Sequence, residues 1–155
     1  MQSFLAAVVL IAFPSLQAQE PKGDLAKLQG RWTRVEAKDA PSLTWVIKGS
    51  DLTGRTKTSK GVDATITCTL KLDEAAKPRV MDSVKIKVDF GGEVGVLEGE
   101  VGVLDYPDEP GIYECEGDTL KVCSGLMGHP RPKTFETSDT QTLTVFRREK
   151  DEPKK

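Results

Sequence analysis

Alternating apolar and polar residues recur in short runs along most of this chain. In the segment ATITCTLKL, threonine and lysine occupy one face, and the apolar face carries Ala64, Ile66, Cys68, Leu70 and Leu72. In the segment VKIKVDF, lysine and aspartate alternate with Val84, Ile86, Val88 and Phe90. This period of two is typical of half-buried β-strands. LTWVI (43–47) and QTLTVFRR (141–148) are further predicted strands, although their faces are less cleanly separated.

One short helix is expected ahead of the strands. The segment GDLAKLQG (23–30) places Asp24 at a capping position, sets Leu25 and Leu28 three residues apart and ends at a glycine. That pattern predicts only a helical turn or two. Many short strands with so little helix favour a closed antiparallel barrel or a sandwich over an α/β arrangement, so the expected fold class is all-β.

The segment GIYECEGDTLKVCSGLMGHPRPKTF (111–135) is rich in reactive side chains but is interpreted as a hairpin. A two-residue turn at 117–118 sets Cys115 opposite Leu120 and Ile112 opposite Cys123. Cys115 and Cys123 then lie on opposite faces and are not expected to bond to each other. The inward face of the hairpin is expected to carry Tyr113, Cys115, Leu120 and Val122.

A metal site in this segment is disfavoured by the number of ligands. Cys123, Met127 and His129 are the soft ligands that copper prefers, but a blue-copper site requires two histidines and the chain has one. A structural zinc site requires four ligands, and the chain's four Cys and His residues are irregularly spaced. The sequence also indicates no pair of a nucleophile and a base, and no pair of carboxylates, that would act as a catalytic site. We therefore expect no enzyme activity, no metal and no cofactor.

The segment GEVGVL occurs twice, at 92–97 and 99–104. One straight strand would send the two copies to opposite faces, because the shift between them is odd. A hairpin turning at 98–99 avoids this, because it sets Val96 against Val101 and Val94 against Val103. A protruding hairpin and a flexible glycine-rich loop both remain open.

The N-terminal segment predicts export. The apolar run FLAAVVLIAF (4–13) has the length of a signal-peptide core and is too short to span a membrane comfortably. The first charged residue is Glu20, and Ala18 offers a small residue for cleavage. We expect a signal peptide over 1–18, a lead-in over 19–27, and a periplasmic or extracellular mature chain with no membrane span. A buried first helix is the alternative, but no amphipathic pattern supports it.

Charge and length limit the classes of binding partner and the number of domains. The formal net charge is −2, and basic and acidic residues are interspersed, so the chain lacks the basic face that nucleic-acid binding requires. A length of 155 residues is enough for one domain. The expected domain covers 28–148 and is followed by a charged tail over 149–155.

Four segments together resemble one family. LQGRW, LKLDEAAKPRVMD, PGIYECEGDTLKVC and GHPRPKTF are similar to the motifs L-Q-G-x-W, K-x-D-x-x-x-x-P-x-x-(I/M)-D, G-I-Y-x-x-x-G-D-x-L-x-x-C and R-P-x-x-F. These motifs are typical of secreted planctomycete-type domains of uncharacterised function, and the resemblance implies a lipocalin-like fold but no reaction, substrate or cofactor. Cys68, Cys115 and the duplicated segment depart from the pattern. The matching residues are Leu28, Gly30, Trp32, Asp73, Pro78, Asp82, Gly111, Ile112, Tyr113, Gly117, Asp118, Leu120, Cys123, Arg131, Pro132 and Phe135.

The lipocalin comparison predicts a structural contact at the base of the barrel. Lipocalins carry Gly-x-Trp at the foot of the first strand, with an arginine of the last strand over the tryptophan. Gly30 and Trp32 follow the predicted helical turn here, and Arg148 ends the last predicted strand. A guanidinium over an indole contributes about 1 kcal/mol, so the pair would join the two strands.

The barrel interior is the candidate binding site, with Trp45, Ile86, Val88, Phe90, Tyr113 and Leu120 as its candidate lining. A mostly apolar lining is typical of a small-molecule pocket and equally of a packed core. The leading hypothesis is an exported domain that binds a small apolar or amphipathic molecule. The alternative is a structural or protein-interaction module whose barrel is filled.

A disulfide between Cys68 and Cys115 is also predicted. Both residues lie on expected inward faces, and exported proteins meet oxidising conditions. Buried, reduced thiols that pack as small apolar groups are the alternative.

Overall fold

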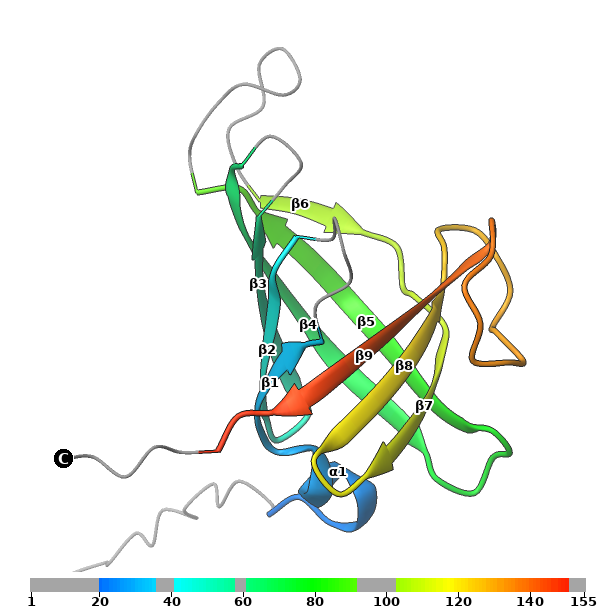
Figure 1. Cartoon of the computed structure of the whole chain (residues 1–155). Helices are drawn as coiled ribbons and strands as arrows, with labels where there is room; N and C mark the ends of the chain where they lie inside the picture. Colours follow the sequence, from blue (N-terminus) through cyan, green and yellow to red (C-terminus); the bar gives the residue numbers. More distant parts are fainter. Residues whose placement is uncertain (1–19, 36–40, 58–60, 92–102, 151–155) are drawn as a thin grey trace, which may run out of the picture.

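The computed structural model describes residues 20–35, 41–57, 61–91 and 103–150. The expected signal peptide, most of the duplicated GEVGVL segment and the end of the charged tail lie outside these residues. No helix in the described part of the chain is both long enough and apolar enough to cross a membrane. The described elements are α1 (Gly23–Leu28), β1 (Gly30–Arg34), β2 (Leu43–Lys48), β3 (Asp51–Lys57), β4 (Asp63–Asp73), β5 (Arg79–Asp89), β6 (Val103–Tyr106), β7 (Gly111–Glu116), β8 (Thr119–Gly125) and β9 (Gln141–Arg148) (Figure 1).

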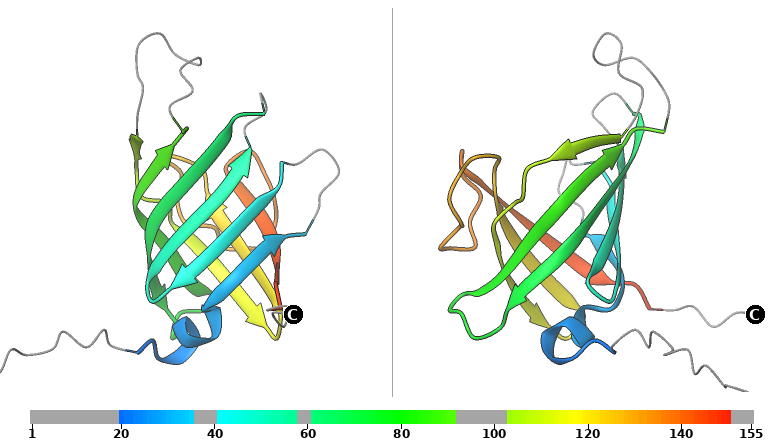
Figure 2. Two further views of the ribbon diagram at one scale, coloured as in Figure 1. Left: turned by 90° about the vertical axis from the view of Figure 1, so that its left-hand side faces the viewer. Right: turned by 180° about the vertical axis from the view of Figure 1, so that it is seen from behind.

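Eight of these strands close into an antiparallel barrel. The order around the barrel is β1-β2-β3-β4-β5-β7-β8-β9, and β9 pairs back with β1 (Figures 1 and 2). β6 is an additional strand that pairs with the far end of β5, beyond the two residues of β5 that pair with β7. Closure removes the unpaired edges that an open sheet would expose. The expected all-β fold, a small antiparallel barrel of lipocalin-like shape with a short N-terminal helix, is confirmed.

The two ends of the barrel differ. Helix α1 lies across one end, beside the short turns that join β2 to β3 and β7 to β8 (Figures 1 and 2). We call this the closed end. The longer connection from β8 to β9 lies at the opposite, open end. The hairpin turn at 117–118 and its predicted pairs, Cys115 with Leu120 and Ile112 with Cys123, are confirmed.

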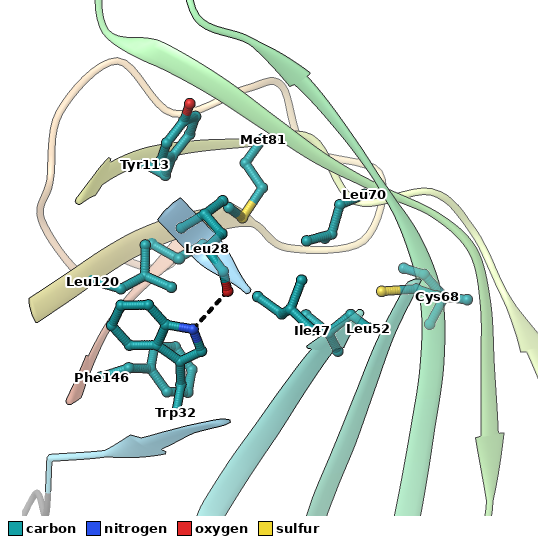
Figure 3. Close-up of a cluster of buried hydrophobic side chains, with 12 residues drawn as sticks. Leu28, Trp32, Ile47, Leu52, Cys68, Leu70, Met81, Tyr113, Leu120 and Phe146 are labelled. Atoms are coloured by element: carbon teal, nitrogen blue, oxygen red, sulfur yellow. Dashed lines mark hydrogen bonds between the residues drawn. The ribbon is translucent and has the colours of Figure 1, made fainter. Parts of the chain in front are cut away.

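A packed core fills the half of the barrel next to α1. Leu28, Trp32, Leu120 and Phe146 are each 0 % exposed, so side chains fill the interior of the barrel at this level. Burying an aliphatic or aromatic side chain of this kind contributes about 1.5–3 kcal/mol. Figure 3 shows that the core joins the helix to strands from both sides of the barrel, through Leu28, Trp32, Ile47, Leu70, Met81, Tyr113, Leu120 and Phe146.

Trp32 and Arg148 form the expected contact between the first and last strands. They are direct partners in the β1–β9 register, and Arg148 Cζ lies 4.2 Å from the centre of the indole ring. The indole Nε1 donates a hydrogen bond of 2.8 Å to the carbonyl of Leu28. Gly30 has a φ of +110°, a conformation that favours glycine, and it carries the chain from α1 into β1 beside the guanidinium.

The guanidinium of Arg148 also holds the end of α1. Its Nη1 donates to the carbonyl of Gln29 at 2.5 Å, and its Nη2 donates to the carbonyl of Lys27. Its Nε lies 3.3 Å from a carboxylate oxygen of Asp118 in the β7–β8 turn. Helix C-terminal carbonyls have no partner within the helix, so a cation placed there satisfies them. Arg148 thus connects α1, β1, β9 and the hairpin turn.

Asp24 is not the helix cap that its position predicts. The N-cap is Lys22, which makes no side-chain capping bond. Asp24 is instead 4 % exposed and accepts a hydrogen bond of 2.9 Å from the Tyr113 hydroxyl. It also forms ion pairs with Lys27 at 2.7 Å and Arg79 at 3.0 Å. These interactions anchor α1 to β5 and β7, which is why the carboxylate faces the barrel rather than its own helix.

Replacing Tyr113 with phenylalanine is expected to lower the free energy of unfolding by about 1–2 kcal/mol, because a buried hydrogen bond to a carboxylate is lost. The hydrogen bond from Lys27 lowers the pKa of Asp24, burial opposes it, and Tyr113 and Arg79 lower it further. This stabilisation is therefore fully present above the ordinary aspartate pKa and is lost as the pH falls through the lowered pKa. Urea unfolding at neutral and acidic pH measures both effects.

The control for this substitution is Tyr106→Phe. The hydroxyl of Tyr106 makes no hydrogen bond among the described residues. The control variant is expected to change stability by less than about 0.5 kcal/mol. Equal losses in the two variants would show that the hydroxyl of Tyr113 does not anchor α1.

A bulge in β5 changes which of its residues face inward. Lys85 has a φ of +54°, and the register with β4 shifts beside it. Beyond this point Thr69 pairs with Val84, and Leu70 pairs with Ser83. Since cross-strand partners share a face, Val84 lies on the side of Thr69 and Ser83 faces inward with Leu70. The predicted single face of Val84, Ile86 and Val88 is therefore interrupted at Val84, although Val84 is itself buried.

Candidate functional site

The open half of the barrel contains a cavity of about 400 Å³. Leu52, Cys68 and Ile86 belong both to the packed core and to the lining of this cavity, so they form its floor. The volume lies within the range of about 300–1,000 Å³ that is typical of small-molecule sites. The lining residues are Leu43, Trp45, Leu52, Ile66, Cys68, Ser83, Ile86, Val88, Tyr106, Glu109, Ser124, Gly125, Leu126, Thr142 and Thr144.

Trp45 forms part of the boundary between the cavity and the packed half. Its ring centre lies 4.1 Å from that of Phe146, with 31° between the ring planes. Gly54 is its partner on β3, and a Cβ at Gly54 would lie 3.3 Å from the indole Cδ1. The absence of a side chain at Gly54 therefore lets the indole lie over the neighbouring strand. Trp45 is half-buried because its other side borders the cavity.

The polar part of the lining centres on Glu109. Glu109 pairs with Ser83 through two backbone hydrogen bonds of 3.0 and 2.9 Å, so it shares the inward face of Ser83. Burial raises the pKa of Glu109. Burial also raises the pKa of the nearby Cys68 thiol to about 11, and the charge of Glu109 contributes to that rise. Cys68 is therefore a neutral thiol near pH 7 and a poor nucleophile.

The predicted interior residues separate into three groups. Trp45, Ile86 and Val88 line the cavity. Tyr113 and Leu120 are fully buried in the packed half and do not reach it. Phe90 is half-buried, follows the end of β5 and lies outside the lining.

Several lining residues were not among the candidates from the sequence. Tyr106 and Glu109 belong to YPDEPG, which is typical of a turn, and Leu126 opens the glycine- and proline-rich β8–β9 connection. The alternation along QTLTVFRR contains the signal for Thr142 and Thr144, because every second residue of a strand shares a face.

All three cysteines are free thiols, so the predicted Cys68–Cys115 disulfide is not formed. Cys68 lies at the cavity floor on β4, whereas Cys115 pairs with Leu120 next to the turn of the closed end. Both face inward as expected, but they lie at different levels of the barrel. Cys123 is 0 % exposed and its thiol donates to the carbonyl of Glu136 at 3.4 Å.

The β8–β9 connection covers Cys123 on the outer wall. Arg131 in this connection donates two hydrogen bonds, of 2.8 and 2.6 Å, to the carboxylate of Asp82 on β5. That carboxylate also accepts the backbone N–H of Gly111 at 3.2 Å. Within the described residues, no group of three or more His, Cys, Asp and Glu side chains is placed to hold a metal ion.

A second hollow lies at the closed end and differs in chemistry. It has a volume of about 420 Å³ and lies between the β4–β5 turn and β7. Its lining includes the charged residues Glu74, Lys77, Arg79, Glu114 and Glu116. Charged groups in water lose hydration when a ligand covers them, so this hollow is a weaker site for an apolar molecule.

No protein-family model, curated protein or solved structure matched this chain. The barrel and its cavity are therefore the observations from which a function is inferred.

Proposed function

We propose that this protein binds a small apolar or amphipathic molecule in the open half of its barrel. The observation that carries this proposal is the cavity of about 400 Å³ above a packed floor. Its wall combines apolar side chains from several strands with a few hydroxyl groups and one carboxyl group, which is the usual composition of a small-molecule site. Transfer of an apolar ligand surface out of water would supply most of the binding free energy.

The rim of the cavity supports the same proposal. Leu126 lines the cavity and is 41 % exposed, and Met127 beside it is 57 % exposed. Leu126 thus places apolar surface at the edge of the cavity, where an apolar ligand can contact it. The alternative of a structural module with a filled barrel has less support, because packed side chains fill only the closed half.

A titration with a neutral phenylnaphthylamine dye tests the proposal, because the fluorescence of such a dye rises in an apolar site. Saturable binding at a ratio of one dye per protein, with displacement by octanol, is the expected result. An absence of saturable binding for both molecules would overturn the proposed function.

Replacing Trp45 with alanine is expected to weaken binding of the dye by about tenfold or more, because one wall of the cavity is removed. The free energy of unfolding should fall by about 1–3 kcal/mol, below the range for a fully buried tryptophan, because the indole already borders a void. Dye titration and urea unfolding of the same variant measure the two effects.

The matched control is Val46→Ala. Val46 adjoins Trp45 on β2 and lines a hollow on the outer surface, with Arg31 and Thr53 as its strand partners. Dye affinity should be unchanged in this variant. An equal loss of affinity in both variants would mean that the dye does not occupy the interior cavity.

A further inference from the structure

The carboxyl group of Glu109 is half-buried in the wall of the apolar cavity and has no side-chain partner among the described residues. Glu109 lines the cavity and shares the inward face of Ser83. Among the residues that the structure describes, no lysine, arginine or histidine pairs with this carboxylate, and no side chain donates a hydrogen bond to it. Its acidic neighbour Asp108 is directed elsewhere, because it accepts the backbone N–H of Lys85 at 3.0 Å.

A half-buried carboxylate in an apolar wall loses part of its hydration, and this loss is unfavourable for an ionised group that has no partner. The other polar groups around this cavity are hydroxyl groups, such as those of Ser83 and Thr144, and they carry no positive charge. The cavity therefore presents a single unbalanced negative group within an apolar wall. A positively charged hydrogen-bond donor on a ligand would balance this negative charge and supply the missing hydrogen bonds.

We propose that the cavity selects an organic amine, whose apolar body fills the space beside Trp45 and whose ammonium group donates hydrogen bonds to the carboxylate of Glu109. This inference rests on the proposed function and names the ligand class of the same cavity. Ser83, which is paired with Glu109, offers a hydroxyl oxygen as a further acceptor for the ammonium group.

Preorganisation favours an amine over a neutral ligand. Forming a buried ion pair usually requires both ions to lose hydration, and that loss can exceed the attraction between them. In this barrel the carboxylate has already lost part of its hydration in the folded protein, because it is half-buried in the apolar wall. The carboxylate therefore has less hydration left to lose on binding than an exposed one, and the attraction acts in a medium of lower dielectric constant than water.

The same carboxylate disfavours an anionic ligand. A fatty acid of equal length would place its own carboxylate in a cavity that already holds one, and like charges at short distance repel. An alcohol would bind through its apolar body and one hydrogen bond. The expected order of affinity at neutral pH is therefore amine, then alcohol, then carboxylate.

Three probes of equal chain length separate these classes: octylamine, octanol and octanoate, each used below its micelle-forming concentration. Calorimetric titration of the full chain at pH 7 and low salt is expected to show octylamine binding about tenfold or more tightly than octanoate, with octanol between them. Dye displacement provides a second measurement with the same probes.

The Glu109→Gln substitution removes the charge and keeps the shape. The affinity for octylamine should fall by about tenfold, and octanoate should bind more tightly than it does to the original protein. Octanol binding should be nearly unchanged. The matched control is Asp105→Asn on β6, because Asp105 lies outside the lining and pairs with Lys87 at 3.6 Å. It removes one negative charge from the same region and should leave the order of the probes intact.

Stability provides an independent check on the premise. Since Glu109 has no side-chain partner among the described residues, Glu109→Gln is expected to unfold at an equal or higher urea concentration than the original protein. A marked fall in the unfolding midpoint would show that the carboxylate supports the fold, and it would overturn the inference.

The outcomes distinguish this inference from the proposed function. Binding of octanol and the dye with no preference for octylamine over octanoate would overturn the amine selectivity and leave the proposed function standing. An equal loss of octylamine affinity in Glu109→Gln and Asp105→Asn would also overturn it, because general electrostatics would then explain the preference. Failure of all the probes to bind would overturn both.

Discussion

Replacing Trp32 with alanine is expected to lower the free energy of unfolding by about 3–5 kcal/mol, the range observed when a large aromatic side chain is deleted from a packed core. Trp32 is 0 % exposed, and its indole is enclosed by α1 and by the last strand. The deletion leaves a cavity in the most densely packed part of the barrel. It also removes the donor that satisfies the carbonyl of Leu28 at 2.8 Å.

Urea unfolding followed by circular dichroism measures this loss. The Trp45→Ala variant is the natural comparison, because it deletes the same side chain from the boundary of the cavity. The loss at Trp32 should clearly exceed the loss at Trp45. Equal losses would mean that the open half is as well packed as the closed half, and the proposed cavity would lose its physical basis.

Replacing Arg148 with alanine is expected to lower the free energy of unfolding by about 2–4 kcal/mol, because charge-assisted hydrogen bonds and a cation–π contact are lost together. The guanidinium donates to the carbonyls of Gln29 and Lys27 and lies over the ring of Trp32. Its removal leaves the carbonyls of Lys27 and Gln29 at the end of α1 without these donors. Thermal and urea unfolding both report the change.

Two further variants make this measurement specific. Arg147→Ala is the matched control, because Arg147 is exposed on the neighbouring position of β9, and this variant should lie within about 0.5 kcal/mol of the original protein. Arg148→Lys should recover less than half of the loss, since an ammonium group cannot reproduce the planar, forked donor geometry. Full recovery with lysine would show that charge alone, rather than geometry, joins the strands.

Local sequence patterns predicted the parts of the fold in which residues close in sequence determine the strand bounds, faces and register. The hairpin of β7 and β8 has its expected register because a glycine turn fixes which residues face each other. The inward face of β4 follows from strict alternation between Ala64 and Leu72, and β9 has the bounds 141–148 of its pattern. The base contact between Trp32 and Arg148 was predicted by the lipocalin comparison rather than by periodicity.

Other parts of the fold depend on tertiary contacts that leave no local signal. The segment that forms β3 contains Leu52 and Gly54 but no apolar alternation, and pairing with strands on both sides makes it a strand. The bulge at Lys85 reverses the faces within β5, although its residues alternate regularly. Asp24 matches a helix cap in sequence, yet Tyr113 and Arg79 lie close enough to bind it from other strands.

The candidate site was harder to predict than the fold, because a cavity is the space that side chains do not fill. Tyr113 and Trp45 are both aromatic residues on inward faces, but only Trp45 reaches the open half. The position of each side chain along the barrel axis determines whether it reaches the cavity, and that position depends on strand tilt and register. Glu109 lies between prolines in a segment typical of a turn, and only its pairing with Ser83 brings it inward.

The division of the barrel into a packed half and a hollow half has a consequence for how such a chain can change over generations. The contacts that hold the fold together gather around Trp32, whereas positions such as Thr142 and Thr144 border open space and support no packing beneath them. Most substitutions away from packed features alter stability little. Substitutions at such positions can therefore change the recognition chemistry of the cavity one residue at a time, with little loss of stability.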